Sequence, residues 1–442
     1  MAEAFSDQRR IESETIRKVG IRLVPFLVVC YFIAYVDRVN VGFAALTMNK
    51  DLGLTATAFG TGAALFFVAY VIFEVPSNLA LERFGARRWI ARIMISWGLV
   101  GLGSAFVTGA VTFSIARFLL GAAEAGFFPG VILYLTYWFP KAYRARIVAM
   151  FMVAIPVSSF LGSPLSAALL TLDGVGGLQG WQWLLICESI PALLLGLATL
   201  VVLPSRPAEA QFLTSEQKAW LEGCLEAERR AASAGHSGHG SVWSVLTNKQ
   251  VWLLAVIYSG SSATSNALSL WMPQILKSFG LSNLETGLLN MIPFGIASVF
   301  MIFWGLRADK SGERIWSTAL PLALTSLSLG LTLLTGSLTI TLVLLSLVLL
   351  GNYSIKGPFF ALVTETLSPA QAAAGIAAIN TLAHLGTGAI TSLIGVLREQ
   401  SGSFPVALLP LCVLTAVGCA LVLWIGRDRL RASAAVAPAP AR

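Results

Sequence analysis

The stretch FIAYVDRVNVGF, residues 32–43, places charged and amide side chains inside an otherwise apolar run. Asp37 and Arg38 are adjacent, so on a helix their side chains point about 100° apart and face different partners. Each charge left unpaired at the centre of a bilayer would cost roughly 2.5–3.5 kcal/mol on insertion scales. We therefore expect Arg38 to face an anion in a cavity and Asp37 to face a neighbouring helix. A structural ion pair between helices is the alternative.

Two phenols share a helix face with this arginine. Tyr31, Tyr35 and Arg38 stand at positions i, i+4 and i+7, which lie above one another on a helix. This face therefore offers aromatic rings, hydroxyl groups and a guanidinium to an anion.

A second apolar run contributes Arg117 and Glu124, seven residues apart and thus on one face. Small residues flank them and would let another helix approach closely: Gly121, Ala122 and Ala125. Together with Asp37 and Arg38 they form a cluster that is neutral when both acids are ionised and cationic when both are protonated. Protonation would free an arginine to take a carboxylate, which predicts movement of H⁺ and an anion in the same direction.

A third cation, Lys356, lies in the apolar run NYSIKGPFFALVTE. Glu365 follows nine residues later, about 13 Å along a helix, and could neutralise Lys356 only poorly. We expect Lys356 to hold a second anionic group of the substrate, so that a dicarboxylate or an aromatic acid with a second polar group lies between Arg38 and Lys356. A structural pair or a snorkelling lysine is the alternative.

Another possible site lies on the run that contains Asn380. His384 is one turn further along the same face. A hydrogen-bonded structural histidine is favoured there over a role in binding substrate or protons.

The elements that carry these residues must be membrane helices. The chain has 442 residues, of which 56% are hydrophobic and only 12% charged, about half the charged fraction of a soluble protein. Apolar windows long enough to cross a bilayer lie near 21–46, 57–79, 89–109, 111–137, 146–168, 181–203, 250–275, 284–306, 315–335, 337–363, 373–397 and 404–426. This pattern predicts an all-α polytopic membrane protein with twelve transmembrane helices in two six-helix halves.

The predicted domains are a six-helix bundle (1–203), a cytoplasmic linker (204–249), a second six-helix bundle (250–426) and a cytoplasmic tail (427–442). Thr214 and Gln217 form a capping-box pattern that predicts a short amphipathic helix in the linker. Lysines and arginines outside the spans lie almost entirely on the side of the N-terminus, which places both termini in the cytoplasm. The basic residues expected on the opposite side are Lys50, Lys277 and Arg398.

Several functions lack their usual sequence signals. Five scattered cysteines without CxxC spacing predict neither disulfides nor a metal site. No catalytic or phosphate-binding motif is present, so neither an enzyme nor a cofactor is expected. A sensor is not expected either, because the sequence has no sizeable soluble domain. The net charge of +8 is explained by the cytoplasmic loops and does not indicate nucleic-acid binding.

An internal repeat supports two related halves. The segments NLALERFGARR (78–88) and GLRADKSGER (305–314) each follow the second span of a half. Aligning Glu82 with Asp309 also aligns Gly85 with Gly312 and the basic residues after each glycine.

These segments resemble the loop signature of the major facilitator superfamily, whose acid is thought to lock against a neighbouring helix end. The first copy departs from the pattern at Asn78 and Glu82. The stretches EVPSNLALERFGARRW, YVDRVNVGFA and RFLLGAAEAGFFPG resemble the anion:cation symporter branch, which transports tartrate, phthalate and sugar acids. The resemblance implies gating roles for Glu82, Arg83, Gly85, Arg87, Asp309, Gly312 and Arg314.

The resemblance further implies the major facilitator fold and H⁺-coupled uptake of an organic anion by alternating access. It assigns proton coupling to Asp37 and Glu124, with Arg117 as their partner. Residues predicted to face substrate are Arg38, Tyr35, Tyr70, Lys356, Asn380, Phe360, Tyr31 and His384. An anion exchanger or an efflux transporter of the same fold is the alternative. A monomer in a bacterial inner membrane is expected, with H⁺ as the coupling ion and the bilayer as its surroundings.

Overall fold

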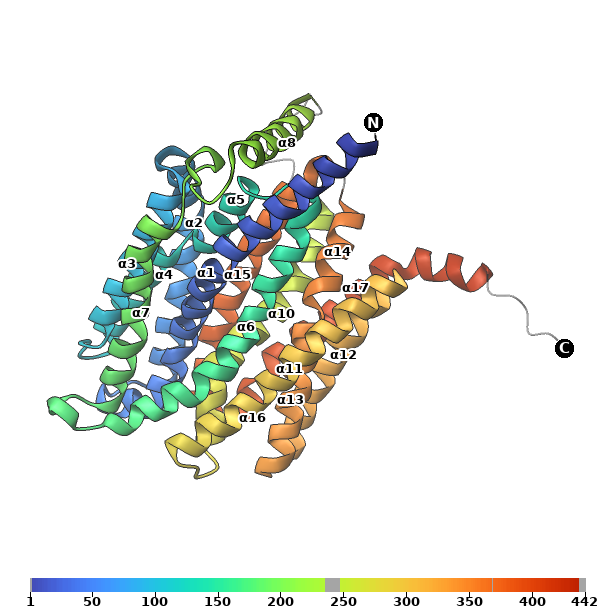
Figure 1. Ribbon diagram of the computed structural model, residues 1–442. Coiled ribbons are helices and arrows are strands. Elements are labelled where there is room, and N and C mark those ends of the chain that lie inside the picture. The colour runs from blue at the N-terminus through green and yellow to red at the C-terminus, as the bar shows by residue number, and fades with distance from the viewer. Residues whose placement is uncertain (1, 235–246, 368, 437–442) are drawn as a thin grey trace. The chain divides into compact units, whose positions relative to one another are not determined.

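The computed structural model describes residues 2–234, 247–367 and 369–436, which form helices joined by short connections (Figure 1). No strand occurs within these ranges. The chain divides into two compact units. Unit 1 comprises Met1–Leu54, Leu65–His239 and Ser282–Leu288, and unit 2 comprises Thr55–Ala64, Gly240–Leu281 and Leu289–Arg442.

The helices of the first half are α1 (Ala2–Asp51), α2 (Ala56–Phe84), α3 (Ala86–Ser104), α4 (Ala110–Glu124), α5 (Phe127–Thr136), α6 (Lys141–Leu169), α7 (Gly180–Val202) and α8 (Ser215–Ala234). Those of the second half are α10 (Lys249–Lys277), α11 (Asn283–Ser311), α12 (Ile315–Leu331), α13 (Leu338–Ser354), α14 (Lys356–Thr366), α15 (Pro369–Ser401), α16 (Phe404–Ala407) and α17 (Leu409–Val436). Single 3-10 turns lie at Leu170–Leu172, Val175–Gly177, Pro207–Glu209 and Thr332–Leu334.

The two units repeat one packing pattern. In unit 1, α1 packs against α6 and α7, and α3 packs against α7 and α4. In unit 2, α10 packs against α15 and α17, and α12 packs against α17 and α13. Gly85 and Gly312 occupy the same turn of the repeat with φ of +86° and +67°, a left-handed conformation that glycine adopts without steric cost. The sequence repeat thus corresponds to a repeat of structure.

The surface of the helices suits a bilayer. Large apolar side chains are exposed on several helices, including Val111, Val201, Val299 and Leu306. Ten helices or helix pairs in the described residues are long and apolar enough to cross a membrane. The predicted spans 89–109 and 250–275 correspond to α3 and α10, which are more polar than those ten.

Their sequences explain the difference. Helix α3 begins with a cluster of arginines, Arg87, Arg88 and Arg92. Helix α10 carries Ser259, Thr264 and Ser265, whose hydroxyls donate to carbonyls one turn earlier in the helix. A hydroxyl satisfied in this way can be buried in an apolar surrounding at low cost.

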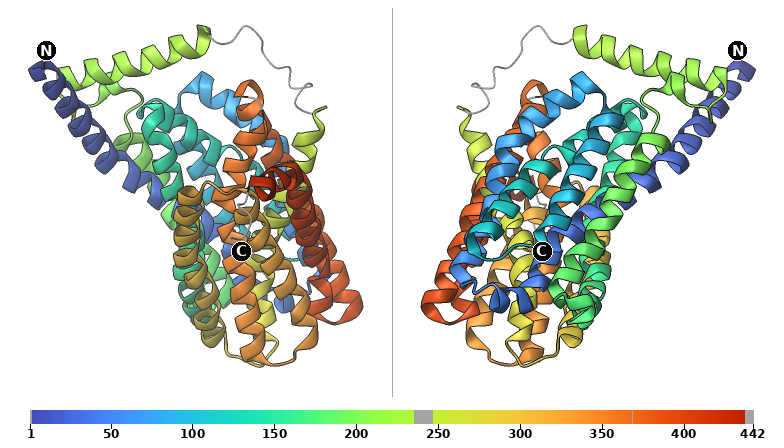
Figure 2. Two further views of the ribbon diagram at one scale, coloured as in Figure 1. Left: turned by 90° about the vertical axis from the view of Figure 1, so that its right-hand side faces the viewer. Right: turned by 90° about the vertical axis from the view of Figure 1, so that its left-hand side faces the viewer.

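Helix α1 is longer than its predicted span 21–46, and its N-terminal turns lie beside α8 (Figure 2). Lys18 Nζ donates to Gln217 Oε1 at 3.1 Å. The predicted capping box is present, because Thr214 and Gln217 each donate a backbone N–H to the other's side chain at 3.3 Å. Helix α8 is therefore the predicted linker helix, whereas linker residues 235–246 lie outside the described residues.

Apart from the span 404–426, which is divided near its start between α16 and α17, two of the predicted spans are each made of two helices. The span 111–137 breaks between α4 and α5, where Gly126 has φ of +82°. The span 337–363 breaks at Ile355, between α13 and α14. Each break lies beside a buried ionisable residue, Glu124 in unit 1 and Lys356 in unit 2. Interrupted helices are typical of transporter sites, because they bring backbone dipoles and side chains into the protein interior.

Candidate substrate and proton site

Buried charge is concentrated in unit 1. Among the residues whose burial the structure describes, the acidic and basic side chains of the core are Asp37, Arg117, Glu124, Glu188 and Lys356, each at most 8% exposed. Lys356 is the member of this set in unit 2. Burial of a charge is costly unless it is paired, so these residues mark candidate functional positions.

Arg38 of α1 forms an ion pair with Glu124, the last residue of α4, through Nη2 and Oε1. The guanidinium is surrounded by aromatic rings, with its carbon 4.8 Å from the ring centroid of Tyr35, 5.4 Å from that of Phe66 and 5.7 Å from that of Tyr70. The Arg38 side chain is only 13% exposed, and its Nε donates to no described residue. Arg38 thus keeps a spare donor inside an aromatic enclosure where cation–π contacts stabilise its charge.

Tyr31 supports this enclosure from one turn earlier on α1. Its ring packs edge-on against Tyr35, with 5.0 Å between ring centroids, and it is buried. Of the two predicted phenols, Tyr35 lies over the guanidinium, while Tyr31 packs behind Tyr35.

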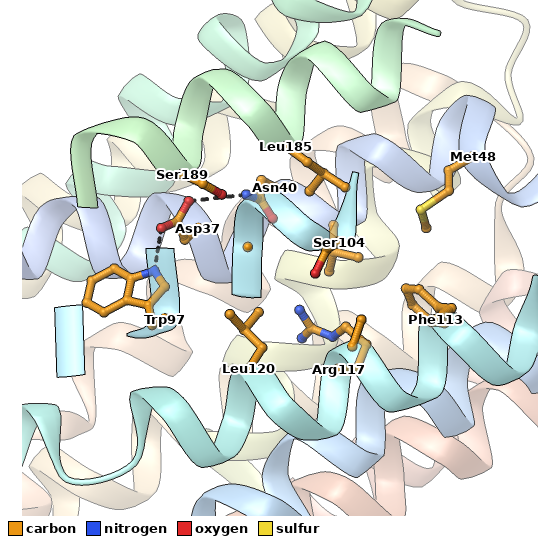
Figure 3. A pocket seen from close by; sticks show the side chains of 13 residues that line it. Asp37, Asn40, Met48, Trp97, Ser104, Phe113, Arg117, Leu120, Leu185 and Ser189 are labelled. Carbon is orange, nitrogen blue, oxygen red and sulfur yellow. Dashed lines mark hydrogen bonds between the residues drawn. The ribbon is translucent and has the colours of Figure 1, made fainter. Parts of the chain in front are cut away.

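Asp37 faces a different set of partners (Figure 3). Trp97 of α3 donates its indole N–H to Asp37 Oδ2 at 2.6 Å, and Asn40 donates to Oδ1 at 3.4 Å. Asp37 forms no ion pair with any described residue, and both Asp37 and Trp97 are buried, at 5% and 1% exposed. Sequence analysis did not identify Trp97, although a buried indole N–H generally requires an acceptor.

Arg117 and Asp37 line the same small cavity, which lies among α1, α3, α4 and α7 (Figure 3). The cavity holds about 20 Å³, enough for about one water molecule and too small for an organic anion. The ring centroid of Phe66 lies 4.9 Å from the guanidinium carbon of Arg117. The Nε of Arg117 donates to no described residue. In this conformation the cavity therefore has room for a water molecule but not for an organic anion.

The structure shows how the charges pair within the predicted cluster of Asp37, Arg38, Arg117 and Glu124. The ion pair of Glu124 is made with Arg38 and not with Arg117. The reason is geometric: seven residues separate Arg117 and Glu124 by about 10 Å along the helix axis, whereas α1 brings Arg38 directly to the end of α4.

Close helix packing holds this arrangement together. A Cβ atom added to Gly121 would lie 2.2 Å from the backbone oxygen of Phe66, so α2 and α4 are in contact at this glycine. This contact agrees with the expectation from the small residues around Glu124. It places Phe66 and Tyr70 of α2 over Arg38.

In unit 2, Lys356 is the first residue of α14, and its Nζ lies 4.6 Å from the ring centroid of Tyr353. Glu365 approaches Arg314, with 3.4 Å between Oε1 and Nε. Phe360 packs against Tyr258 with 5.1 Å between ring centroids. Asn380 and His384 are half-buried on α15.

The two copies of the loop signature differ. In unit 2, Arg314 donates to Asp309 at 3.0 Å and also approaches Glu365, so the turn at Gly312 is tied to α14. In unit 1, Glu82 and Arg83 are exposed and Arg87 is half-buried. Glu82, which corresponds to Asp309, makes no ion pair with a described residue.

Comparisons with known proteins agree with this architecture. A protein of Agrobacterium vitis named "Putative tartrate transporter" is 45% identical over 422 residues, covering 96% of this chain and 93% of the relative. A "Quinolone resistance transporter" of Acinetobacter baumannii is 38% identical, covering 93% of this chain and 94% of the relative. The crystal structure of a D-xylose-proton symporter has the same fold, with a TM-score of 0.73 at 16% identity, covering 92% of this chain and 97% of that one.

The relatives and the fold are those of transporters and not of enzymes. Residues 27–391 match the family described as the Major Facilitator Superfamily. This match and the relatives confirm the predicted fold class and the resemblance on which it rested. The chain belongs to the Major Facilitator Superfamily.

Proposed function

We propose that this transporter is a symporter of the anion:cation branch that takes up an organic anion together with H⁺. The observation that supports the proposal most directly is the ion pair between Arg38 and Glu124 inside its aromatic enclosure. A carboxylate substrate and the Glu124 carboxylate would compete for the same guanidinium. Protonation of Glu124 removes the competing negative charge, and Arg38 can then take the substrate carboxylate through two parallel N–H donors.

Because Arg38 is buried, the binding of a substrate carboxylate is coupled to the protonation of Glu124. Breaking a buried ion pair by removing one partner costs about 3–5 kcal/mol, because the remaining charge is left without compensation. Two states of the site avoid this cost: Glu124 ionised with no substrate, or Glu124 protonated with a substrate carboxylate bound. A carboxylate that enters the site is therefore accompanied by a proton, and its release returns Arg38 to Glu124.

The substrate class follows from the cations and from the relatives. A relative named for tartrate transport supports a dicarboxylate or a sugar acid. In this proposal Lys356 takes the second acidic group, and Asn380, Phe360 and His384 contribute further contacts from unit 2. The protein would act by alternating access of its two halves in a bacterial inner membrane, as a monomer with both termini in the cytoplasm.

Uptake of radiolabelled L-tartrate into proteoliposomes tests the proposal. With acidic buffer outside and neutral buffer inside, the wild type should accumulate tartrate, and a protonophore should abolish the accumulation. Glu124→Gln should lose accumulation but keep tartrate counterflow, because its Arg38 has no competing carboxylate. Glu216→Gln, which removes an exposed acid on α8, is the matched control and should behave as wild type. Gradient-driven accumulation by Glu124→Gln would reject the assignment.

Export is the second candidate, because one relative is named for quinolone resistance. The same vesicles distinguish the two directions. Tartrate accumulation driven by external acid supports symport. Expulsion of a preloaded quinolone against its gradient, without tartrate accumulation, would support efflux, and tartrate–tartrate exchange without any response to pH would support an exchanger.

A further inference from the structure

Glu188 is a buried acid of unit 1 to which the function proposed above gives no role. Glu188 of α7 is 3% exposed. Ser166 of α6 donates its hydroxyl to Glu188 Oε1 at 2.7 Å, while Oε2 accepts from no described residue. Glu188 also forms no ion pair within the part of the chain that the structure describes. A carboxyl group is therefore held in the bundle interior with a single hydroxyl donor.

Among the described residues, the helices around α7 bring polar groups toward Glu188 but no paired cation. Helix α6 contributes Ser166, and α1 contributes the Asn40 amide, which lies near the Glu188 carboxyl and donates to Asp37 Oδ1 at 3.4 Å. The charge that interacts with Glu188 from α1 is Asp37, another acid.

Helix α3 approaches too closely to insert a long side chain next to this position. A Cβ atom added to Gly101 would lie 2.4 Å from Ser189 Oγ, on the residue after Glu188. The neighbouring titratable group on α7 itself is Cys187, a neutral thiol in its ordinary form.

These surroundings disfavour a carboxylate. An unpaired ion in a low-dielectric interior carries a penalty of several kcal/mol, and such a group usually becomes neutral instead. Asp37 is better suited to carry a negative charge, because it accepts two N–H donors. Two carboxylates on either side of the Asn40 amide would also repel each other. The lowest-cost arrangement places a proton on Glu188 and leaves Asp37 ionised.

We propose that Glu188 is a further proton-binding site of unit 1, linked to Asp37 through Asn40. The inference deepens the proposed proton coupling, since the two acids then bind protons as a pair and Glu188 influences the pH at which Asp37 is protonated. The proton on Glu188 itself does not depend on which substrate is carried. Its test can therefore be made without substrate.

Infrared difference spectroscopy of the purified full-length protein in lipid nanodiscs provides that test. At neutral pH the wild type should show the C=O stretching band of a protonated carboxyl in a dry environment, and Glu188→Gln should lose it. Ser166→Ala should keep the band and shift it to higher frequency, because the carbonyl loses a hydrogen bond. Asp37→Asn should also retain the band.

An unchanged band in Glu188→Gln, loss of the band in Asp37→Asn, or a wild type without such a band would overturn the inference. If Glu188→Gln does not fold, Ser166→Ala still assigns the band without altering the acid, and an unshifted band in this variant would count against Glu188. Failure of tartrate transport would reject the proposed function but leave these spectra unaffected, so the two ideas fail separately.

Discussion

Trp97→Phe tests whether the indole hydrogen bond sets the proton affinity of Asp37, one of the two acids predicted to couple transport to H⁺. In the wild type, Trp97 donates to Asp37 at 2.6 Å, whereas the other donor, Asn40, is at 3.4 Å. Phenylalanine keeps an aromatic ring in α3 but removes the shorter of these two hydrogen bonds. A hydrogen bond to a charged group contributes about 1.5–3 kcal/mol, and about 1.4 kcal/mol corresponds to one pH unit.

The sign of the effect follows from the charge that the donor stabilises. The indole N–H favours ionised Asp37 over protonated Asp37, so its removal makes protonation easier. We expect the limb of the pH profile that depends on Asp37 to move upward by about 1–2 pH units.

The assay is L-tartrate counterflow as a function of pH, and Asp37→Asn identifies the limb by abolishing it. Trp271→Phe is the matched control, because Trp271 is equally buried and its indole N–H donates to no described residue. Both variants lose similar volume from a packed core, so a general effect of destabilisation should appear in both. An unchanged midpoint, a downward shift, or equal shifts in the two tryptophan variants would refute the role of the hydrogen bond.

Two further predictions concern the second cation and the helix contact. Lys356→Ala should weaken the inhibition of tartrate counterflow by dicarboxylates about 10- to 100-fold, because one charge-assisted hydrogen bond is lost, and should have little effect on inhibition by monocarboxylates. Equal losses for both classes would indicate a structural lysine. Gly121→Ala should lower thermal stability by about 1–3 kcal/mol, because its Cβ would lie 2.2 Å from Phe66 O. Gly103→Ala, where a Cβ meets nothing within 4 Å, should be neutral or stabilising, and a similar loss in both variants would contradict the packing argument.

Local sequence patterns were sufficient for the helices and for the class of protein. Runs of apolar residues long enough to cross a bilayer need no tertiary information, because the bilayer requires every backbone group to be bonded within its own helix. The repeat at Gly85 and Gly312 was likewise visible, since a left-handed turn requires the same residue in both halves. The breaks beside Glu124 and Lys356 were not predicted, because each run is long enough to be taken as one continuous span, although glycine and proline follow both charged residues.

For the site, the sequence determined which residue types lie at membrane depth and which share a helix face. It placed Asp37 and Arg38 on different sides of α1 from helix geometry alone. Only the tertiary structure decided their partners: Arg38 meets Glu124, and Asp37 meets Trp97. The pairing of side chains depends on which helices are neighbours and on the height at which they cross. The spacing of residues along one helix gives no information on either. The same holds for Glu188, because the protonation of a single acid within a span can be argued only once the groups around it are known.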